Sequence, residues 1–451
     1  MNDRTIVFIG GGAAGATAAL ETRKRLRNAR ILLLESGPFP QYSCCALPFV
    51  VSRDIGSFED IIVYEESFYR DFGKMELMLN THVDSIDRKN KNVTFGGSSI
   101  AYDKLVIATG SYALKPPING LENIELGNRT FLFKYMPEAI EMDKKAKGSK
   151  RAIVIGAGLV GLEVADALNK RGVGVTIVEL LPTIMHFMVD DDIAKTVINH
   201  LASTGIEMML DTMVTHMGED HSGVRVMAGD DVLEADICVI ASGVRAETRL
   251  ASEAGLDVNQ GIIVDPMMRT SDPDIYSCGD CTEAMGAITG EPTLSQLGST
   301  AVRQARVVAD NLAGEESKMP PVLNTAITHL GGLQVASVGL TSGNARKAGF
   351  DVLSARFRGS TLPEYYPGGK PLTIKLIFNA EKRILGGQIV GEEGVLSRVN
   401  TLSAVMQCGG GLDTLYSLET AYTPPISPTT DPLSLAAAIA LKKCKRARKK
   451  D

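Results

Sequence analysis

The chain has 451 residues, of which 44% are hydrophobic and 22% are charged, as expected for a globular protein with room for two or three domains. It contains no apolar run of about 18 residues, and its first residues do not form a signal-peptide pattern, so we expect no membrane span. The net charge of −6 gives no reason to expect nucleic acid as a partner.

The chain begins with alternating strand and helix patterns. A β-branched run at Thr5–Ile9 leads into a glycine turn, an alanine-rich helix over about 15–26 and a second apolar run at 30–35. The same arrangement returns over 152–179. Such βαβ units build parallel sheets with helices on both faces. The pattern therefore predicts an α/β fold in which two Rossmann-like dinucleotide-binding domains share one design.

The first glycine turn has the spacing of a dinucleotide-binding fingerprint. In Gly10-x-Gly12-x-x-Gly15, the first glycine permits a tight turn, the second lets the backbone approach a pyrophosphate, and the third lets helix and strand pack closely. The helix N-terminus offers free N–H groups to the phosphates. Glu35 ends the next strand, where it can accept hydrogen bonds from ribose hydroxyls.

The second glycine turn repeats this fingerprint as Gly156-x-Gly158-x-x-Gly161, and Glu179 ends the strand that follows. Two fingerprints predict two dinucleotides. A carboxylate that holds the ribose 2′-OH would repel a 2′-phosphate, and no arginine directly follows Glu179. The sequence therefore favours NADH over NADPH.

The pattern changes after about residue 323. Three segments have the pattern of antiparallel strands: 334–340, 372–378 and 384–390. Helices are predicted at 396–407 and 433–442. This part of the chain predicts an α+β domain. A basic tail follows, which we expect to be solvated and disordered, with contact to nucleic acid or a membrane surface as the alternative. Its basic residues are Lys442, Lys443, Lys445, Arg446, Arg448, Lys449 and Lys450.

The seven cysteines are an odd number, scattered along a long chain. This usage argues against a secreted disulfide framework and for a reducing compartment, so we expect a cytoplasmic protein in which single thiols carry chemistry. Cys278-Gly-Asp-Cys281 has the spacing of a metal or thioredoxin-like motif. No other cysteine or histidine pair lies nearby in the sequence, so we expect no metal site.

Three further segments resemble motifs of the pyridine nucleotide–disulfide oxidoreductases. They are 102–110 (YDKLVIATG), 236–243 (DICVIASG) and 270–280 (TSDPDIYSCGD). In that family, similar segments close the FAD domain, close the NADH domain and contact FAD a second time. The resemblance covers residues 1 to about 315 and implies FAD and NADH as cofactors. It also implies a homodimer whose interface domain completes the partner's active site.

The same resemblance implies a domain order. We expect the first half of the FAD-binding domain at 1–111, the NADH-binding domain at 112–247, the second half of the FAD-binding domain at 248–320, and a dimerisation domain at 321–451. Asp280 would bind the ribityl chain of the flavin. The other residues for which the resemblance implies cofactor contacts are Ala13, Ala14, Ser36, Thr109, Gly110, Lys134, Glu163 and Gly243.

The segment 41–49 (QYSCCALPF) narrows the resemblance to one branch of the family. Disulfide reductases with a C-x4-C pair carry two cysteines here, and that pair is absent. The segment is similar to the single-cysteine branch, which includes coenzyme A-disulfide reductases, NADH oxidases and NADH peroxidases. Cys45, followed by Ala-Leu-Pro, matches the redox cysteine of that branch.

Neighbouring residues bear on the choice within that branch. The family often has Asn where this chain has Cys44 and Ser where it has Gln41, and both are linked to coenzyme A contacts. Coenzyme A therefore stays open as a substrate or mixed-disulfide partner, and Cys44 is either a packing residue or a second redox thiol. Oxidases and peroxidases carry a histidine at the position of Ala13, which disfavours peroxide chemistry. Cations that could contact coenzyme A phosphates are Arg23, Lys24, Arg70 and Lys74.

Two segments, 364–368 (EYYPG) and 421–425 (AYTPP), resemble the paired tyrosine motifs of coenzyme A-disulfide reductases. There, tyrosines of the partner subunit reach the redox cysteine. Carried over, Tyr366 (or Tyr365) and Tyr422 would donate a proton to a departing thiolate, because a phenol with a pKa of about 10 stays protonated at neutral pH.

Together these features predict an FAD-dependent enzyme that uses NADH to reduce a small-molecule disulfide, polysulfide or persulfide through Cys45. One alternative is an NADH oxidase or peroxidase that uses a Cys45 sulfenic acid. Another is a flavoprotein electron-transfer subunit that acts on a partner protein.

Overall fold

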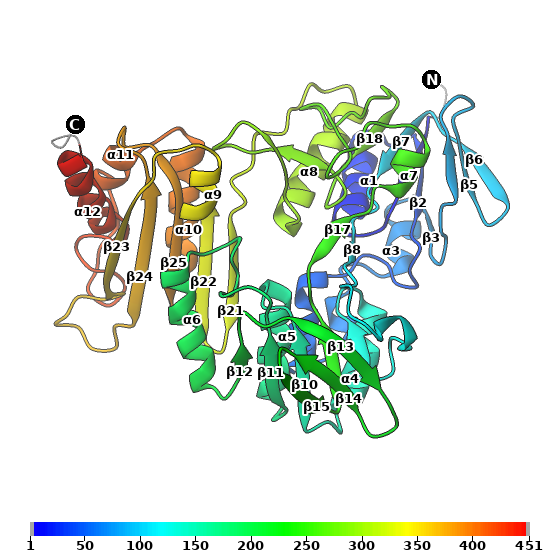
Figure 1. The fold of residues 1–451 in the computed structure, drawn as a ribbon. Coiled ribbons are helices and arrows are strands. Elements are labelled where there is room, and N and C mark those ends of the chain that lie inside the picture. Colours follow the sequence, from blue (N-terminus) through cyan, green and yellow to red (C-terminus); the bar gives the residue numbers. More distant parts are fainter. Residues whose placement is uncertain (1–3, 448–451) are drawn as a thin grey trace.

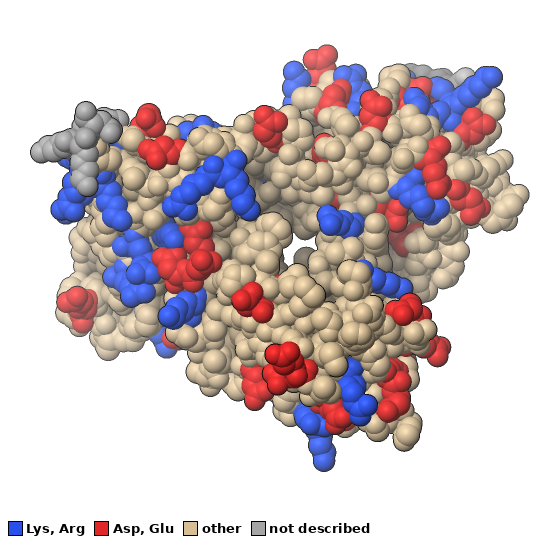
Figure 2. Space-filling model, viewed as in Figure 1, with Lys and Arg blue, Asp and Glu red and all other residues tan. Residues whose placement is uncertain are grey.

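The computed structural model describes residues 4–447 and arranges them in three units, each built around a five-stranded sheet (Figure 1). The N-terminal and C-terminal units lie at opposite ends of the molecule, with the central unit below and between them. Figure 2 shows a hollow between the units that opens through the molecule. No helix among residues 4–447 is long and apolar enough to cross a membrane.

The N-terminal unit is a parallel sheet covered on both faces. Helices α1 and α8 pack against each other on one face, where alanines of α1 allow close contact. Strands with both faces covered are expected to be almost entirely apolar. In the first strand, four of the five residues are apolar and buried. The sheet has the order β18-β7-β1-β2-β3. Its elements are β1 (Thr5–Ile9), β2 (Arg30–Leu34), β3 (Glu76–Met78), β7 (Lys104–Ile107), β18 (Ile275–Ser277), α1 (Ala13–Arg25), α3 (Glu66–Asp71), α7 (Arg249–Glu253) and α8 (Gly298–Leu312).

The central unit repeats this winding, with the sheet order β12-β11-β10-β16-β9 and parallel pairing throughout. Two parallel sheets of one design confirm the predicted pair of Rossmann-like folds. The elements are β9 (Thr130–Leu132), β10 (Arg151–Ile155), β11 (Gly174–Val178), β12 (Glu207–Met209), β16 (Ile237–Ile240), α4 (Met136–Ala146), α5 (Leu159–Lys170) and α6 (Asp191–Ser203). The chain enters and leaves this unit through a two-stranded ribbon, β8 (Ser111–Ala113) with β17 (Val244–Ala246).

The C-terminal unit is an antiparallel sheet with helices packed on it, which confirms the predicted α+β domain. The sheet order is β21-β22-β25-β24-β23. The elements are β21 (Ala326–Leu330), β22 (Leu333–Gly339), β23 (Leu353–Ser360), β24 (Pro371–Phe378), β25 (Ile384–Gly391), α9 (Ser342–Lys347), α10 (Val395–Gln407), α11 (Leu412–Tyr416) and α12 (Pro432–Ala447).

Helix α12 corrects the expectation of a disordered basic tail. The helix continues to Ala447 rather than ending at Lys442, so the first four basic side chains of the tail lie on ordered helix. Buried Cys444 packs into the core of the unit, which holds this last turn in place. Arg448, Lys449 and Lys450 lie outside the described residues.

Smaller elements complete the fold. Three-stranded antiparallel sheets lie beside the N-terminal and central sheets, and the sequence reading did not predict them. They contain β4 (Ser85–Asp87), β5 (Asn92–Phe95) and β6 (Ser98–Ala101), and β13 (Val214–Glu219), β14 (Val224–Ala228) and β15 (Asp231–Ala235). The remaining elements are α2 (Leu47–Val51) and the hairpin of β19 (Glu283–Met285) with β20 (Pro292–Leu294).

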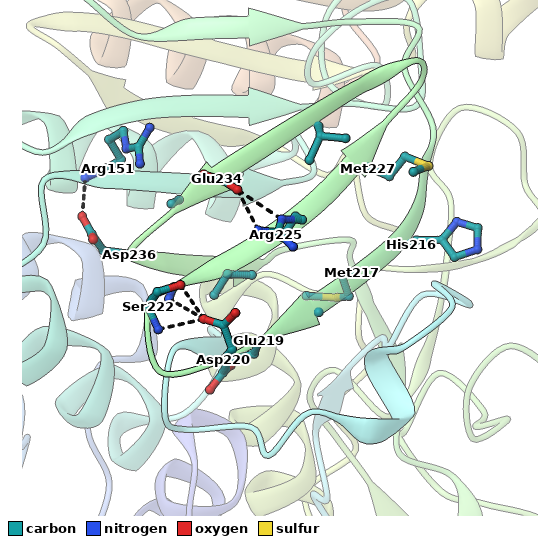
Figure 3. Close-up of a pocket in the computed structure, with 15 residues that line it drawn as sticks. Arg151, His216, Met217, Glu219, Asp220, Ser222, Arg225, Met227, Glu234 and Asp236 are labelled. Carbon is teal, nitrogen blue, oxygen red and sulfur yellow. Dashed lines mark hydrogen bonds and ion pairs between the residues drawn. The ribbon is translucent and has the colours of Figure 1, made fainter.

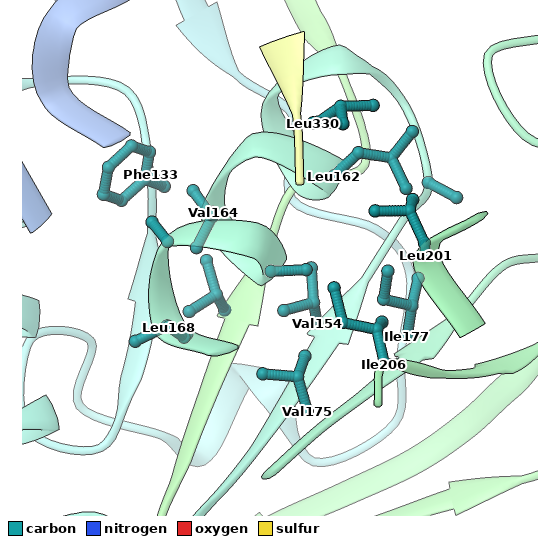
Figure 4. Packing of buried hydrophobic residues seen from close by; sticks show 14 of the residues in the cluster. Phe133, Val154, Leu162, Val164, Leu168, Val175, Ile177, Leu201, Ile206 and Leu330 are labelled. Atoms are coloured by element: carbon teal, nitrogen blue, oxygen red, sulfur yellow. The ribbon is translucent and has the colours of Figure 1, made fainter. Parts of the chain in front are cut away.

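One continuous hydrophobic cluster joins the three units. It includes Val50 of α2, Val154 and Leu162 of the central unit, and Leu330 of β21. Figure 4 shows the central part of this cluster, where side chains of α5 pack onto β10 and β11. The helix that follows the two adjacent cysteines is therefore packed against the central unit rather than only against its own sheet.

This core generates a test of stability. Ile177 is fully buried in β11, so Ile177→Ala should lower the free energy of unfolding by about 2–5 kcal/mol, because it removes buried methyl groups and leaves a cavity. Ile177→Val should cost only about 0.5–1.5 kcal/mol. Urea unfolding followed by circular dichroism measures both, and an unchanged midpoint for the alanine variant would contradict this account of the core.

Candidate functional site

The first glycine turn has the geometry that its spacing predicts. Gly10 has a φ of +102°, and a Cβ there would collide with the carbonyl oxygen of Ala108. A Cβ on Gly15 would collide with the carbonyl oxygen of Gly10, so helix α1 can approach the strand only with glycine at this position. A Cβ on Gly12 would meet no atom within 4 Å, so the backbone there is open to a ligand.

The second glycine turn repeats these three properties. Gly156 has a φ of +108° and sits against the carbonyl of Ala241, and Gly161 sits against the carbonyl of Gly156. Gly158 again has no neighbour within 4 Å of a Cβ. Both turns therefore have one open glycine at a helix N-terminus, which is where a dinucleotide pyrophosphate binds.

An acidic side chain is held beside each open turn. Glu35 accepts hydrogen bonds from the backbone N–H groups of Gly11 and Gly37, both at 2.6 Å. Glu179 likewise accepts from Ala157 at 2.6 Å and Leu181 at 2.8 Å. Each carboxylate is thus fixed in orientation while its remaining lone pairs stay available to ribose hydroxyls.

Asp280 lies where the return strand β18 meets helix α1. It accepts a hydrogen bond from Ser111 Oγ at 2.7 Å and pairs with Lys134 Nζ at 3.5 Å. The neighbouring Gly279 has a φ of +88°, and a Cβ there would lie 2.8 Å from the Cβ of Ala14. The turn that carries Asp280 therefore packs directly on the first turn of α1, and the sequence-predicted residues Ala14, Lys134 and Asp280 come together.

Two glutamines in and just before α8 were not predicted from the sequence. Gln304 of α8 accepts a hydrogen bond from Gly279 N–H at 2.8 Å and holds the return turn in place. Gln296, just before α8, has a buried amide nitrogen without a hydrogen-bond partner among the described residues. An unpartnered buried donor is costly, so this amide fits a bound polar ligand. No motif in the sequence marks either residue.

The other predicted cofactor residues lie at the ends of strands. Ser36 Oγ lies 3.4 Å from a Glu35 oxygen. Thr109 donates to the carbonyl of Glu247 at 2.7 Å, and Gly110 follows it with a φ of +72°. Gly243 accepts from Leu114 N–H in the crossing between units. Ala13 opens α1. The open glycines and the clamped acids together fit FAD at the first turn and a nicotinamide dinucleotide at the second.

Cys44 and Cys45 lie on a single 3-10 turn (Cys44–Ala46) directly before α2. Both side chains reach the surface, yet enough protein surrounds them that desolvation raises the pKa of each thiol. Tyr42 accepts a hydrogen bond from Met136 N–H at 3.0 Å, which ties the cysteine turn to the central unit.

Charges from different parts of the chain act on the Cys45 thiol. After desolvation, the carboxylate of Glu163 contributes most to its raised pKa; Lys134 opposes this shift and Asp280 adds to it. Glu163 lies in α5 and accepts a hydrogen bond from Thr328 of β21 at 2.6 Å. Burial raises the pKa of Glu163 as well. All three units therefore contribute to the surroundings of this thiol.

The tyrosines of the C-terminal unit form a pair that differs in part from the expected one. The hydroxyls of Tyr365 and Tyr422 lie 2.8 Å apart, whereas Tyr366 is beside them and 37% exposed. Hydrogen bonds from Thr429 and Tyr365 lower the pKa of Tyr422. In Figure 1 these loops lie on the unit farthest from the N-terminal unit that carries Cys45.

A shallow cavity of 450 Å³ lies elsewhere, on the antiparallel sheet of the central unit (Figure 3). Arg225 and Glu234 pair across it at 2.9 Å, and Asp236 accepts from Arg151 N–H at 2.9 Å. None of the sequence-predicted site residues lines it.

The CxxC motif at 278–281 is buried structure. Cys278 and Cys281 are fully buried, and the Cys281 thiol donates to the carbonyl of Cys278. Across residues 4–447 no group of three side chains is arranged to hold a metal ion.

Comparison with known proteins agrees with this geometry. Residues 4–305 match the family model described as pyridine nucleotide-disulphide oxidoreductase, and residues 325–432 match the dimerisation domain of the same family. The chain belongs to this family. Its members use FAD and NAD(P)H.

Three relatives illustrate the range of named activities. A protein named NADH oxidase from Methanocaldococcus jannaschii is 36% identical, with 97% of this chain and 98% of that protein covered. An NAD(P)H coenzyme A polysulfide/persulfide reductase from Pyrococcus horikoshii is 26% identical, with coverage of 97% and 98%. The solved structure of an NAD-dependent persulfide reductase from A. fulgidus superposes with a TM-score of 0.95 at 32% identity, covering 98% of this chain and 84% of that one.

The charge on Glu163 generates a pH-dependence test. Because this carboxylate raises the pKa of Cys45, Glu163→Gln should lower that pKa, and alkylation of Cys45 by iodoacetamide should reach its half-maximal rate at a lower pH. Rates measured against pH, with Cys45 identified by mass spectrometry, check this. Glu141→Gln, in an exposed pair with Lys144, is the control, and a profile identical to that control would contradict the assignment.

Proposed function

We propose that this protein is an NADH-dependent flavoprotein that reduces a disulfide, polysulfide or persulfide through the single redox cysteine Cys45. The observation that carries the proposal is the accessible Cys45 thiol just before α2, on which charged groups of the N-terminal and central units act. Such a thiol is suited to sulfur exchange, because the thiolate is the attacking species and its stability is set by neighbouring charges.

The residues supply binding and proton handling, while a bound FAD supplies electron transfer from NADH. The Cys45 thiolate attacks a sulfur–sulfur bond of the substrate, one thiolate leaves, and Cys45 remains as a mixed disulfide. Lys134 favours the thiolate, since its cation lowers the pKa of Cys45. Two electrons and one proton then cleave the mixed disulfide, which returns Cys45 to the thiolate and releases the second thiol.

Tyrosines complete the cycle in a homodimer. The dimerisation-domain match supports such an assembly, in which Tyr422 and Tyr366 of one subunit would approach Cys45 of the other. Tyr422 would protonate the departing thiolate. Its hydroxyl is held by Tyr365 at 2.8 Å, and its lowered pKa makes it a better proton donor than an ordinary phenol.

Cys44 is a second thiol of the same turn, and its role is either packing or redox. Tyr42 donates a hydrogen bond toward Cys44 and opposes the rise in its pKa. A disulfide between adjacent residues would strain the intervening peptide. Cys44 is therefore the matched control for Cys45 rather than its equivalent.

Coenzyme A stays open as the carrier of the sulfur substrate. One relative bears its name, but a cation that could bind its phosphates is committed elsewhere in this chain. The Arg23 guanidinium donates to the carbonyls of Gly73, Lys74, Leu26 and Arg27. Of the other candidates, Lys24 pairs with Glu21 and Arg70 with Asp71, both in exposed positions.

An NADH oxidase is the second candidate, because a relative with 36% identity carries that name. Ala13 argues against it, since the oxidases and peroxidases that this chain resembles have histidine there. Turnover of one preparation with coenzyme A disulfide, polysulfide, oxygen and peroxide separates the candidates. Oxygen consumption that matches NADH loss would overturn the proposal.

Cys45→Ser tests the redox cysteine. This variant should bind FAD and accept electrons from NADH as the parent does, while reduction of polysulfide falls to background, because serine cannot form the mixed disulfide. NADH-dependent product formation measures the loss. Cys44→Ser should keep most of the activity, and full turnover by Cys45→Ser would sink the assignment.

Glu179→Gln tests the choice of nicotinamide. Removing the carboxylate beside the second glycine turn should reduce the preference for NADH over NADPH, measured as the ratio of kcat/KM values, by about tenfold, the equivalent of about 1.4 kcal/mol. Glu207→Gln, an exposed glutamate on β12 of the same sheet, is the control. An unchanged ratio would show that Glu179 does not determine the preference for NADH over NADPH.

A further inference from the structure

The orientation of the central unit depends on contacts with its neighbours as well as on the two segments that connect it to the rest of the chain. The chain enters and leaves it only through the β8–β17 ribbon, which by itself does not fix an orientation. On the opposite side, α6 and α5 contact β22 and β21 of the C-terminal unit (Figure 1). Several polar contacts cross this boundary, including Thr328 with Glu163 and His200 with the Gly331 carbonyl, and Asp190 takes part in more of them than any other residue described here.

Asp190 stands at the N-terminus of α6 and is bound by three residues of the C-terminal unit. Lys375 Nζ of β24 lies 2.7 Å from its carboxylate. Ser342 donates to it twice, from the backbone N–H at 2.8 Å and from the hydroxyl at 2.6 Å. Gln388 accepts from the Asp190 N–H at 3.0 Å. Hydrogen bonds from Lys375 and Ser342 lower the pKa of Asp190 against the effect of its burial.

Lys375 is an unusual lysine. It is only 7% exposed, and it also pairs with Asp192 of α6 at 2.5 Å. A buried ammonium needs such partners, because desolvating an unpaired charge is costly. Both of its carboxylate partners belong to the central unit, so this lysine of the C-terminal sheet is satisfied only when the two units are docked.

The segment that ends at Asp190 begins beside the second glycine turn. Residues 180–190 run from Glu179, which contacts that turn, to Asp190. Within this segment Met185 N–H donates to the carbonyl of Ala157, the residue between Gly156 and Gly158, at 3.0 Å. Ile184, Met185 and Val189 are buried in the shared core. Movement of Asp190 would therefore be transmitted to the backbone of the turn.

We propose that Lys375 is a positioning residue for NADH, which fixes the second glycine turn through Asp190 and the segment 180–190. The inference rests on the proposed binding of NADH at that turn. It assigns the C-terminal unit a role within its own subunit, separate from any contribution to a partner.

The test uses the FAD-containing enzyme under anaerobic conditions and follows bleaching of the flavin by NADH in a stopped-flow instrument. Lys375→Met removes the cation at similar side-chain length. The NADH concentration for half-maximal rate should rise about tenfold, while the limiting rate changes less than about twofold. Lys382→Met is the matched control, because Lys382 forms an exposed pair with Asp413 inside the C-terminal unit.

Ser342→Ala removes a hydrogen bond to Asp190 and keeps all the charges. It should raise the NADH concentration for half-maximal rate by a smaller factor. This variant tests the proposal if Lys375→Met fails to fold. No change for either variant relative to Lys382→Met would overturn the positioning role. So would an equal fall in limiting rate with no change in NADH dependence. If NADH fails to bleach the flavin of the parent enzyme, the proposed function itself is wrong, which is a separate outcome.

Discussion

The molecule depends on the close approach of a helix N-terminus to the end of a parallel strand, made possible by glycine. At Gly15 and Gly161 there is no room for a Cβ against the preceding turn, so the helix begins directly over the strand. This approach leaves the open backbone at Gly12 and Gly158 facing outward. Backbone N–H groups at the same turns are bound by Glu35 and Glu179, so one local constraint both opens the proposed phosphate site and fixes the acid beside it.

The sulfur centre depends instead on packing between units. Cys45 precedes a short helix whose Leu47, Val50 and Val51 are buried in the cluster that also holds the central sheet and β21. The thiol therefore stays at the boundary where Glu163 and Lys134 of the central unit reach the N-terminal unit. In the proposed mechanism, a change at the start of α5 would reach Cys45 through Glu163, which lies on the same helix five residues after the open Gly158.

Much of this could be predicted from the sequence, and the reason is locality. The glycine turns lie only 24 and 22 residues before their acids, so spacing along the chain identifies them. The contacts that position the site are distant in sequence. Thr328 and Glu163 are 165 residues apart and Ser342 and Asp190 are 152 apart. Neither pair forms a sequence motif. Threonine and serine are common surface residues, so nothing in the sequence marks Thr328 or Ser342 as a partner of these acids.

The helical course of residues 442–447 escaped prediction for a related reason. A run of basic residues indicates solvent exposure, but a helix needs only one buried face. On α12 that face is formed by alanines and ends at Cys444, which is 1% exposed. The basic residues therefore predict which face of the segment is exposed to solvent, but they do not predict whether the backbone is helical.

Under these two proposals the C-terminal unit has two separable tasks, which the amino-acid composition of the unit does not distinguish. Its tyrosine loops belong to the unit at the opposite end of the molecule from the N-terminal unit (Figure 1), which is why we propose that they act on sulfur in a second subunit. Its β21, β24 and β25 bind α5 and Asp190 of the same chain. The residues for the two tasks are different: Thr328, Lys375 and Gln388 bind the central unit, whereas the tyrosines lie in loops outside the strands. Substitutions at the contacts with Asp190 should therefore affect NADH, whereas those at the tyrosine loops should affect the sulfur substrate.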